Sequence, residues 1–171
     1  HKNTITHLFV ADDVTTIGIN AFSASVNLVF VVMPEVTSIG INAFSDCHSL
    51  STINIPKVVT ISRYAFINSR LITVDMPEVT SVGEFAFYGC STLTTVDMPE
   101  VTTIAEQAFQ GCSALSDVEM PKASYVGISA FGGCAVTTVK MPEVTTVAAN
   151  AFSPCLNLTT VELPKVTSIG S

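Results

Sequence analysis

Cysteines are the residues with the most reactive side chains in this chain, and most of them are evenly spaced. The chain has five: Cys47, Cys90, Cys112, Cys134 and Cys155. The last four are 22, 22 and 21 residues apart. No pair has the Cys-x-x-Cys spacing of a zinc site, and one thiol every 22 residues would form a line rather than surround an ion. We interpret the thiols as small buried hydrophobic groups.

Carboxylates recur with the same spacing and could attract a cation or a basic partner. One recurring position holds Asn54, Asp75, Asp97, Glu119, Lys140 and Glu162, and Asp117 lies two residues before Glu119. Carboxylates about 5 Å apart in water repel by somewhat under 1 kcal/mol. Three interpretations stay open: an ordinary solvated acidic face, a surface for a basic protein patch, or a calcium site. No loop with densely spaced oxygen ligands supports calcium.

Several chemical functions lack their usual residues. The histidines His1, His7 and His48 have no metal-ligand spacing, and no phosphate-binding loop or nucleophile elbow is present. We therefore expect no enzyme and no cofactor. A net charge of −7 argues against nucleic acid as a partner. No apolar run approaches the ~20 residues of a membrane span, and the first residues, His1, Lys2 and Asn3, do not resemble a signal peptide.

A repeat of the whole chain determines where these side chains lie. Phenylalanine recurs at intervals of 21 or 22 residues, at Phe22, Phe44, Phe66, Phe87, Phe109, Phe131 and Phe152. Proline recurs with the same period, at Pro34, Pro56, Pro77, Pro99, Pro121, Pro142 and Pro164. Two markers with one period in the low twenties predict a solenoid in which equivalent residues stack coil upon coil.

Each repeat can be divided into elements. Residues 93–98, Leu-Thr-Thr-Val-Asp-Met, alternate like a strand with one buried face, and Pro99 marks its end and a corner. A second short extended piece follows in residues 101–104, then a bend at a small residue such as Ala105. The Ala-Phe segment lacks alternation, and we predict a short helical turn there. Coils three and six lose one residue after this turn.

Two further columns follow from the same alignment. The position after each proline carries mixed charges: Glu35, Lys57, Glu78, Glu100, Lys122, Glu143 and Lys165. We expect weak ladders of ion pairs that fix the register of the coils. The second short strand carries hydroxyl rows that include Thr37, Thr80, Thr102 and Thr145. We interpret these rows as ordinary strand surface, with an ice- or polysaccharide-binding face as the alternative.

The run Leu-x-x-Val-x-Met-Pro-x-Val-Thr-x-Ile-Gly-x-x-Ala-Phe-x-x-Cys resembles the BspA-type leucine-rich repeat over nearly the whole chain. Ser25 and Ser69 replace cysteine, and Ala11 and Asp12 replace the Met-Pro pair in the first coil. The resemblance implies a curved solenoid on the surface of bacteria or mucosal protists. It also implies adhesion, including binding of host matrix and plasma proteins, and no catalytic residues.

We therefore predict an α/β, strand-dominated fold. It is a right-handed leucine-rich-repeat solenoid with a parallel sheet on the concave side and short helical turns or loops outside. Residues 1–171 form one solenoid of about seven repeats plus a truncated one, which we interpret as a fragment of a longer protein. Exposed sheet edges at the two ends would permit end-to-end self-association.

The expected function is a non-enzymatic, adhesion-type protein-binding module of a cell-surface or secreted protein. A structural spacer or stalk without its own ligand is the alternative. A host or matrix protein is the expected partner, and the compartment is extracellular or the cell surface. The predicted partner-binding face comprises Asn54, Asp75, Asp97, Asp117, Glu119, Lys140 and Glu162.

Overall fold

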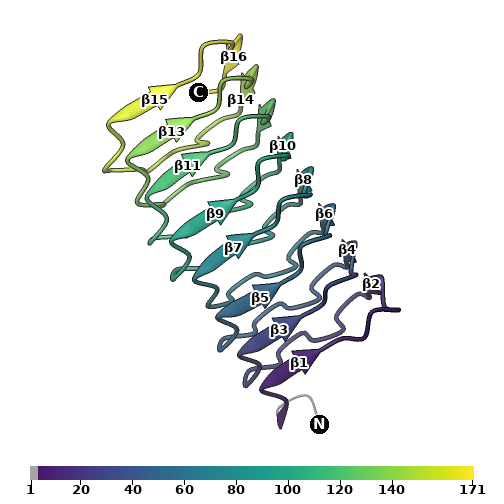
Figure 1. The fold of residues 1–171 in the computed structure, drawn as a ribbon. Helices are drawn as coiled ribbons and strands as arrows, with labels where there is room; N and C mark the ends of the chain where they lie inside the picture. Colours follow the sequence, from purple (N-terminus) through teal and green to yellow (C-terminus); the bar gives the residue numbers. More distant parts are fainter. Residues whose placement is uncertain (1–3) are drawn as a thin grey trace.

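The chain winds as a stack of similar coils, each with one longer and one shorter strand (Figure 1). A computed structural model describes residues 4–171; residues 1–3, where the sequence begins with polar side chains, lie outside the described part. The longer strands are β1 (His7–Phe9), β3 (Phe30–Val32), β5 (Thr52–Asn54), β7 (Thr73–Asp75), β9 (Thr95–Asp97), β11 (Asp117–Glu119), β13 (Thr138–Lys140) and β15 (Thr160–Glu162). The shorter strands are β2 (Thr16–Ile17), β4 (Ser38–Ile39), β6 (Thr60–Ile61), β8 (Ser81–Val82), β10 (Thr103–Ile104), β12 (Tyr125–Val126), β14 (Thr146–Val147) and β16 (Ser168–Ile169).

Equivalent residues lie directly above one another, as the repeat predicts. In the parallel pair β7–β9, Thr73 aligns with Thr95 and Asp75 with Asp97. The shorter strands β8 and β10 align in the same way, again in parallel. Because the middle residue of each longer strand points inward and its neighbours point outward, one register fixes both the core and the surface columns. The predicted strand-rich solenoid is confirmed.

The shorter strands, and not the longer ones, form the continuous sheet. They pair in one eight-stranded sheet, whereas the longer strands divide into sheets of three, two and three. The sequence analysis expected one continuous sheet of longer strands. The shorter strands lie between two corners whose separation never changes, from Pro77 to Gly83 for example, whereas the longer strands follow the segment that loses residues. The break between β5 and β7 coincides with one such deletion; the break between β9 and β11 does not.

The proline corners are tight turns, as predicted. The carbonyl of Met76 accepts a hydrogen bond from the N–H of Val79 at 3.2 Å, which closes a four-residue turn with Pro77 in its second position. Proline favours that position because its ring fixes φ near the value that the turn needs. Gly83 marks the next corner, where a Cβ atom would lie 2.8 Å from the backbone of Ser62. Close coil packing therefore explains the small residue.

The seven repeated phenylalanines form one stacked spine inside the coils. Successive ring centroids are 5.1–5.4 Å apart and the ring planes differ by only 3–12°. The five inner rings are fully buried, while Phe22 and Phe152 at the two ends of the spine are partly exposed. Offset stacks of this kind add to the stabilisation from burying the rings. The spine thus joins every coil to its neighbours.

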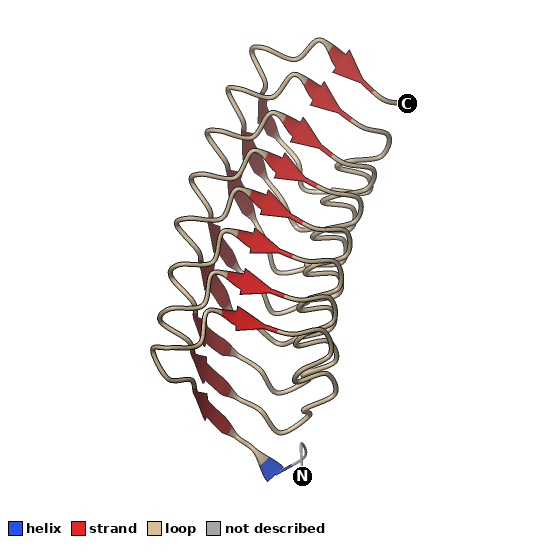
Figure 2. Ribbon diagram, turned by 90° about the vertical axis from the view of Figure 1, so that its right-hand side faces the viewer, coloured by secondary structure: helices blue, strands red, loops and turns tan. Residues whose placement is uncertain are grey.

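The outer segment around each Ala-Phe pair is a chain of turns, and the predicted helical turn is wrong in this respect. Thr4 is the one helical residue among residues 4–171, in a 3₁₀ conformation, and Figure 2 shows strands joined by loops. The residue two before each phenylalanine has a left-handed φ of 50–59°; these residues are Asn20, Asn42, Tyr64, Phe85, Gln107, Ser129 and Asn150. A left-handed residue in every outer segment prevents a helix from continuing.

Backbone hydrogen bonds in this outer segment alternate between two kinds of partner. Asn42, Phe44 and Asp46 donate their N–H groups to carbonyls of the next coil at 2.8–3.2 Å. The intervening residues Ala43 and Ser45 donate to carbonyls three positions back in their own coil, both at 3.2 Å. The alternation satisfies the buried backbone without a helix or a strand, and it bonds each coil to the next on this side as well.

Candidate functional site

The structure places all seven predicted partner-binding residues on one exposed surface. We call this surface the long-strand face, defined by the outward positions of the longer strands: His7, Phe9, Phe30, Val32, Thr52, Asn54, Thr73, Asp75, Thr95, Asp97, Asp117, Glu119, Thr138, Lys140, Thr160 and Glu162. The seven predicted side chains are all exposed. Asp75 lies directly beside Asp97, and Lys140 lies between Glu119 and Glu162 in the register of the strands.

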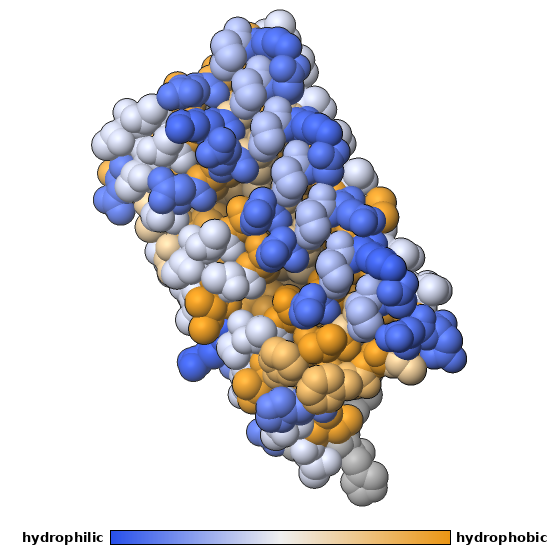
Figure 3. All heavy atoms as spheres, in the orientation of Figure 1, coloured by the Kyte–Doolittle hydropathy of each residue, from blue (hydrophilic) through white to orange (hydrophobic). Residues whose placement is uncertain are grey.

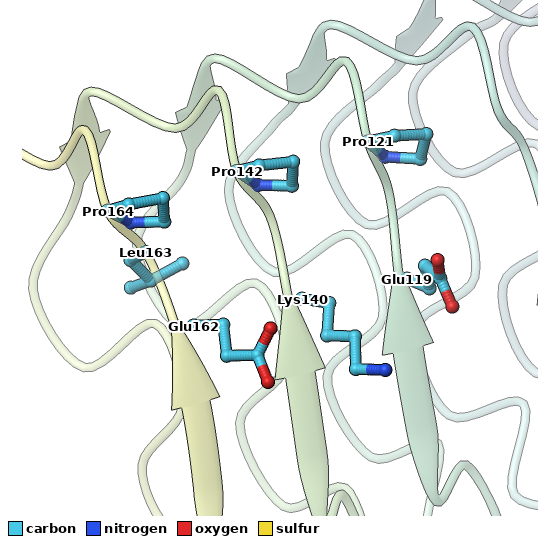
Figure 4. Close-up of a pocket in the computed structure, with 7 residues that line it drawn as sticks. All are labelled: Glu119, Pro121, Lys140, Pro142, Glu162, Leu163 and Pro164. Atoms are coloured by element: carbon cyan, nitrogen blue, oxygen red, sulfur yellow. The ribbon is translucent and has the colours of Figure 1, made fainter.

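A shallow hollow of about 550 Å³ brings three of these residues together near the C-terminal end of the face. Glu119, Lys140 and Glu162 line one side of it (Figure 4). The opposite side is apolar: Pro121, Pro142, Leu163 and Pro164. None of the four ion pairs in residues 4–171 involves Lys140, so its ammonium group remains available to a partner. The hollow therefore offers both charges and an apolar wall.

Asp117 extends the charged region and is held in place by hydroxyl groups. Ser116 Oγ donates a hydrogen bond to Asp117 Oδ2 at 2.7 Å, and Thr137 Oγ1 donates to Asp117 Oδ1 at 3.4 Å. A smaller hollow of about 210 Å³ lies between this carboxylate and Lys140. The described residues contain no group of three or more His, Cys, Asp or Glu side chains able to hold a metal ion. The arrangement is suited to binding charged groups through hydrogen bonds.

The N-terminal end of the long-strand face is aromatic, which the sequence analysis missed. The centroid of the Phe30 ring lies 5.8 Å from that of Phe9 and 6.1 Å from that of His7. Phe9 is 69% exposed. Figure 3 shows apolar surface over β1 and β3 and polar surface over the strands further along. The signal was available, because Phe9 occupies the column that carries Asn54 and Asp75 in later coils.

The cysteines are free thiols that lie inside the coils, in agreement with the packing interpretation. Four are buried and Cys155 is half-buried. Each Sγ donates a hydrogen bond at 3.2 Å to the carbonyl of the phenylalanine one coil earlier, for example Cys90 to Phe66. Burial raises the pKa of the Cys90 thiol to about 12 and that of Cys155 to about 11. These protonated thiols are poor nucleophiles.

The hydroxyl row on the shorter strands is engaged within the protein. Thr102 Oγ1 donates to the carbonyl of Thr80 at 3.1 Å, and Ser124 Oγ donates to Thr102 at 3.1 Å. The same bond recurs at Thr37, Thr80, Thr145 and Thr167. Since these hydroxyl protons already bond the coils together, they are not available to water or sugar. This favours the strand-surface interpretation over an ice- or polysaccharide-binding face.

The expected charge ladder forms as separate pairs. Lys57 Nζ lies 2.5 Å from Glu35, Lys122 lies 2.5 Å from Glu100 and Lys165 lies 2.7 Å from Glu143. In each pair the lysine belongs to the coil after the glutamate. The hydrogen bond to Glu35 raises the pKa of Lys57. These pairs lie beyond the proline corners, off the long-strand face, and are consistent with a role in register.

Stacked parallel coils with a variable outward face define a leucine-rich-repeat solenoid. A model of the BspA type leucine-rich repeat region matches residues 15–125 and 102–171. The chain belongs to this family, as its repeat motif indicates. A search of curated proteins found no match.

Solved structures of bacterial proteins share the fold. The leucine-rich repeat protein of T. pallidum has a TM-score of 0.74 and 24% identity, over 97% of this chain and 73% of its own. A leucine-rich cell surface protein of Faecalibacterium prausnitzii has a TM-score of 0.62 and 24% identity, over 94% of this chain and 60% of its own. A leucine-rich repeat protein of Bacteroides ovatus has a TM-score of 0.50, 20% identity and coverage of 96% and 71%.

The same fold bears on the membrane. Within residues 4–171 there is no helix long and apolar enough to cross a bilayer.

Proposed function

We propose that this chain is a non-enzymatic, adhesion-type module that binds a protein through the long-strand face. One observation carries the proposal: buried columns stay constant while the outward column of the longer strands changes from Phe9 to Asp75 to Lys140. A rigid core with a variable surface is typical of solenoids that recognise macromolecules. The family and the cell-surface relative support a location at the cell surface or outside the cell.

The two ends of the face suggest what the partner carries. Asp75, Asp97 and Glu119 would attract basic side chains, while the exposed rings of Phe9 and Phe30 would bury an apolar anchor. Buried aromatic groups supply much of the affinity of protein interfaces, and complementary charges set specificity and association rate. A host or matrix protein segment with an apolar end and a basic stretch fits this arrangement.

The test measures binding to immobilised fibronectin, fibrinogen and laminin by surface plasmon resonance. The variant D75K/D97K/E119K reverses three charges on the long-strand face. The control D13K/E78K/E106K reverses three exposed charges that lie off this face. We expect saturable binding that weakens at least tenfold in the first variant, changes much less in the control and falls with added salt. Equal losses in both variants would remove the long-strand face from the proposal.

A spacer or stalk remains the second candidate, and the continuous phenylalanine spine favours it. Such a stack could hold another domain away from a surface without a ligand of its own. It predicts no saturable binding to any of the three proteins. That result would support the spacer over the binding module.

A further inference from the structure

A polar groove runs across the outer segments of the first three coils, on a different side from the long-strand face. It has a volume of about 340 Å³ and is lined by planar polar side chains, among them Asn20, Asn42, Asp46 and Asn68, with Tyr64 at one end. Ser23 Oγ and Ser45 Oγ share a hydrogen bond of 2.8 Å within it. The three asparagines and the aspartate come from consecutive coils, so their amide and carboxylate groups are spaced about one strand separation apart, ~4.8 Å.

The charges around this groove are already neutralised. Asn68 Nδ2 donates a hydrogen bond to Asp46 Oδ1 at 2.8 Å. Arg63 Nε lies 3.1 Å from Glu84 Oε2, next to Tyr64. The Arg63 guanidinium also lies 4.6 Å from the centroid of the Tyr64 ring. Since each charge has a local partner, the groove suits an uncharged ligand with many hydroxyl groups better than an ion.

The aromatic end of the groove is built at a cost in backbone strain. Tyr64 and Phe85 have φ values of 59° and 56°, a left-handed conformation that is uncommon for bulky residues. Coils one, two and seven place asparagine at the same position, which tolerates this conformation well. Strained residues cluster at ligand sites, and an aromatic pair replaces asparagine here.

The two rings support each other. Their centroids are 5.0 Å apart and their planes differ by 26°. Phe85 belongs to the coil after Tyr64, whereas the rest of the groove belongs to the coils before it. Phe85 therefore packs behind Tyr64 and leaves the opposite ring face toward the groove. Tyr64 is thus a fixed aromatic platform next to a row of amides.

We propose that this groove binds a neutral carbohydrate chain. A sugar ring has an apolar C–H face that stacks on tyrosine, and hydroxyl groups that exchange hydrogen bonds with asparagine and aspartate side chains. A few placed polar groups beside an aromatic surface are typical of small-molecule sites. The site goes beyond the proposed protein-binding function, because it lies on the outer turns and uses none of the long-strand face.

The test is isothermal titration calorimetry with cellohexaose, maltohexaose, xylohexaose and N-acetylchitohexaose as probes. The variant Y64N introduces the residue of coils one and two, so it should fold with an unchanged or higher melting temperature. The matched control Y125T removes an exposed tyrosine on β12 and restores the usual threonine. We expect one or more probes to bind the wild type, Y64N to weaken binding at least tenfold and Y125T to leave it unchanged.

Three outcomes would overturn the assignment: no saturable binding of any probe, equal binding by Y64N, or Tyr64-dependent binding of an extended peptide with no sugar bound. The D75K/D97K/E119K variant separates this site from the protein-binding proposal. Its carbohydrate affinity should equal that of the wild type. A failure of either proposal is therefore visible without affecting the other.

Discussion

Cys112 Sγ donates a hydrogen bond of 3.2 Å to the carbonyl oxygen of Phe87, one coil earlier. The same pairing of a thiol with a phenylalanine carbonyl recurs at each of the other cysteines. It satisfies a backbone oxygen inside the core with a side chain that is otherwise apolar. Burial raises the pKa of Cys112 well above its usual range, so the thiol remains a donor.

Thiol labelling should follow burial. At pH 8 we expect iodoacetamide to modify Cys155 first, because it is half-buried, and to leave Cys90 and Cys112 unmodified while the protein is folded. In denaturant all five should react. Mass spectrometry of digested samples gives the order. Rapid labelling of Cys90 in the folded protein would contradict the buried column.

Alkaline pH should destabilise the fold through the same thiols. An unfolded thiol ionises near its ordinary pKa of 9.0, whereas burial raises the pKa of folded Cys90 to about 12. The folded state then holds more protons, so stability is complete below pH 9 and is lost as pH rises toward 12. The slope is about 1.4 kcal/mol per pH unit for each thiol. Urea unfolding at several pH values should show a shallower decline in C90A.

Removing one ring from the middle of the spine should cost more than removing one at its end. Phe87→Ala leaves a cavity between two fully buried rings, and we expect a loss of about 3–5 kcal/mol in the free energy of unfolding. Phe22→Ala should cost less, because that ring is partly exposed and stacks on one side only. Urea unfolding followed by circular dichroism tests this. Equal losses would contradict a continuous spine.

Ser25 Oγ is a buried oxygen without a hydrogen-bond partner among the residues of the described chain. Ser25→Ala should therefore stabilise the protein by about 1 kcal/mol, since it removes an unsatisfied polar group. Ser69 is the matched control, because its Oγ bonds with Cys90 Sγ at 3.2 Å. Ser69→Ala should lower stability or leave it unchanged. Thermal unfolding of the two variants gives the two signs directly.

Asp75 and Asp97 are neighbours in the same outward column. Their repulsion should make Asp97→Asn more stable than the wild type by less than ~1 kcal/mol, with a difference that shrinks in 1 M salt. Unfolding at low and high salt measures this effect. A destabilised Asp97→Asn would show that the carboxylate has a favourable local partner, and would weaken its assignment to partner binding.

The period of the sequence predicted what lies above what. The phenylalanine spine, the thiol column and the pair of Glu35 with Lys57 all follow from equivalent positions in neighbouring coils. Because coils stack in register, a column in the alignment becomes a column in space. The long-strand face was predicted for the same reason.

The period did not predict how the backbone bends within a coil. The outer segment was interpreted as helical because it lacks alternation, yet asparagine at positions 20, 42 and 150 and glycine at 89, 111 and 133 mark left-handed turns. The Tyr64–Phe85 stack and the ion pair of Arg63 with Glu84 depend on those turns, so they could not be found from spacing. The Phe9–Phe30 contact was missed because attention went to charges in that column.

The hydrogen bonds between coils run along the axis of the stack, on the long-strand side, the short-strand side and the outer turns alike. A pulling force along that axis would load them in series, so the stack should peel one coil at a time. Each coil of 22 residues would release about 75 Å of extended chain. The protein would thus lengthen in steps under flow or traction, dissipating mechanical energy while the remaining coils stay intact.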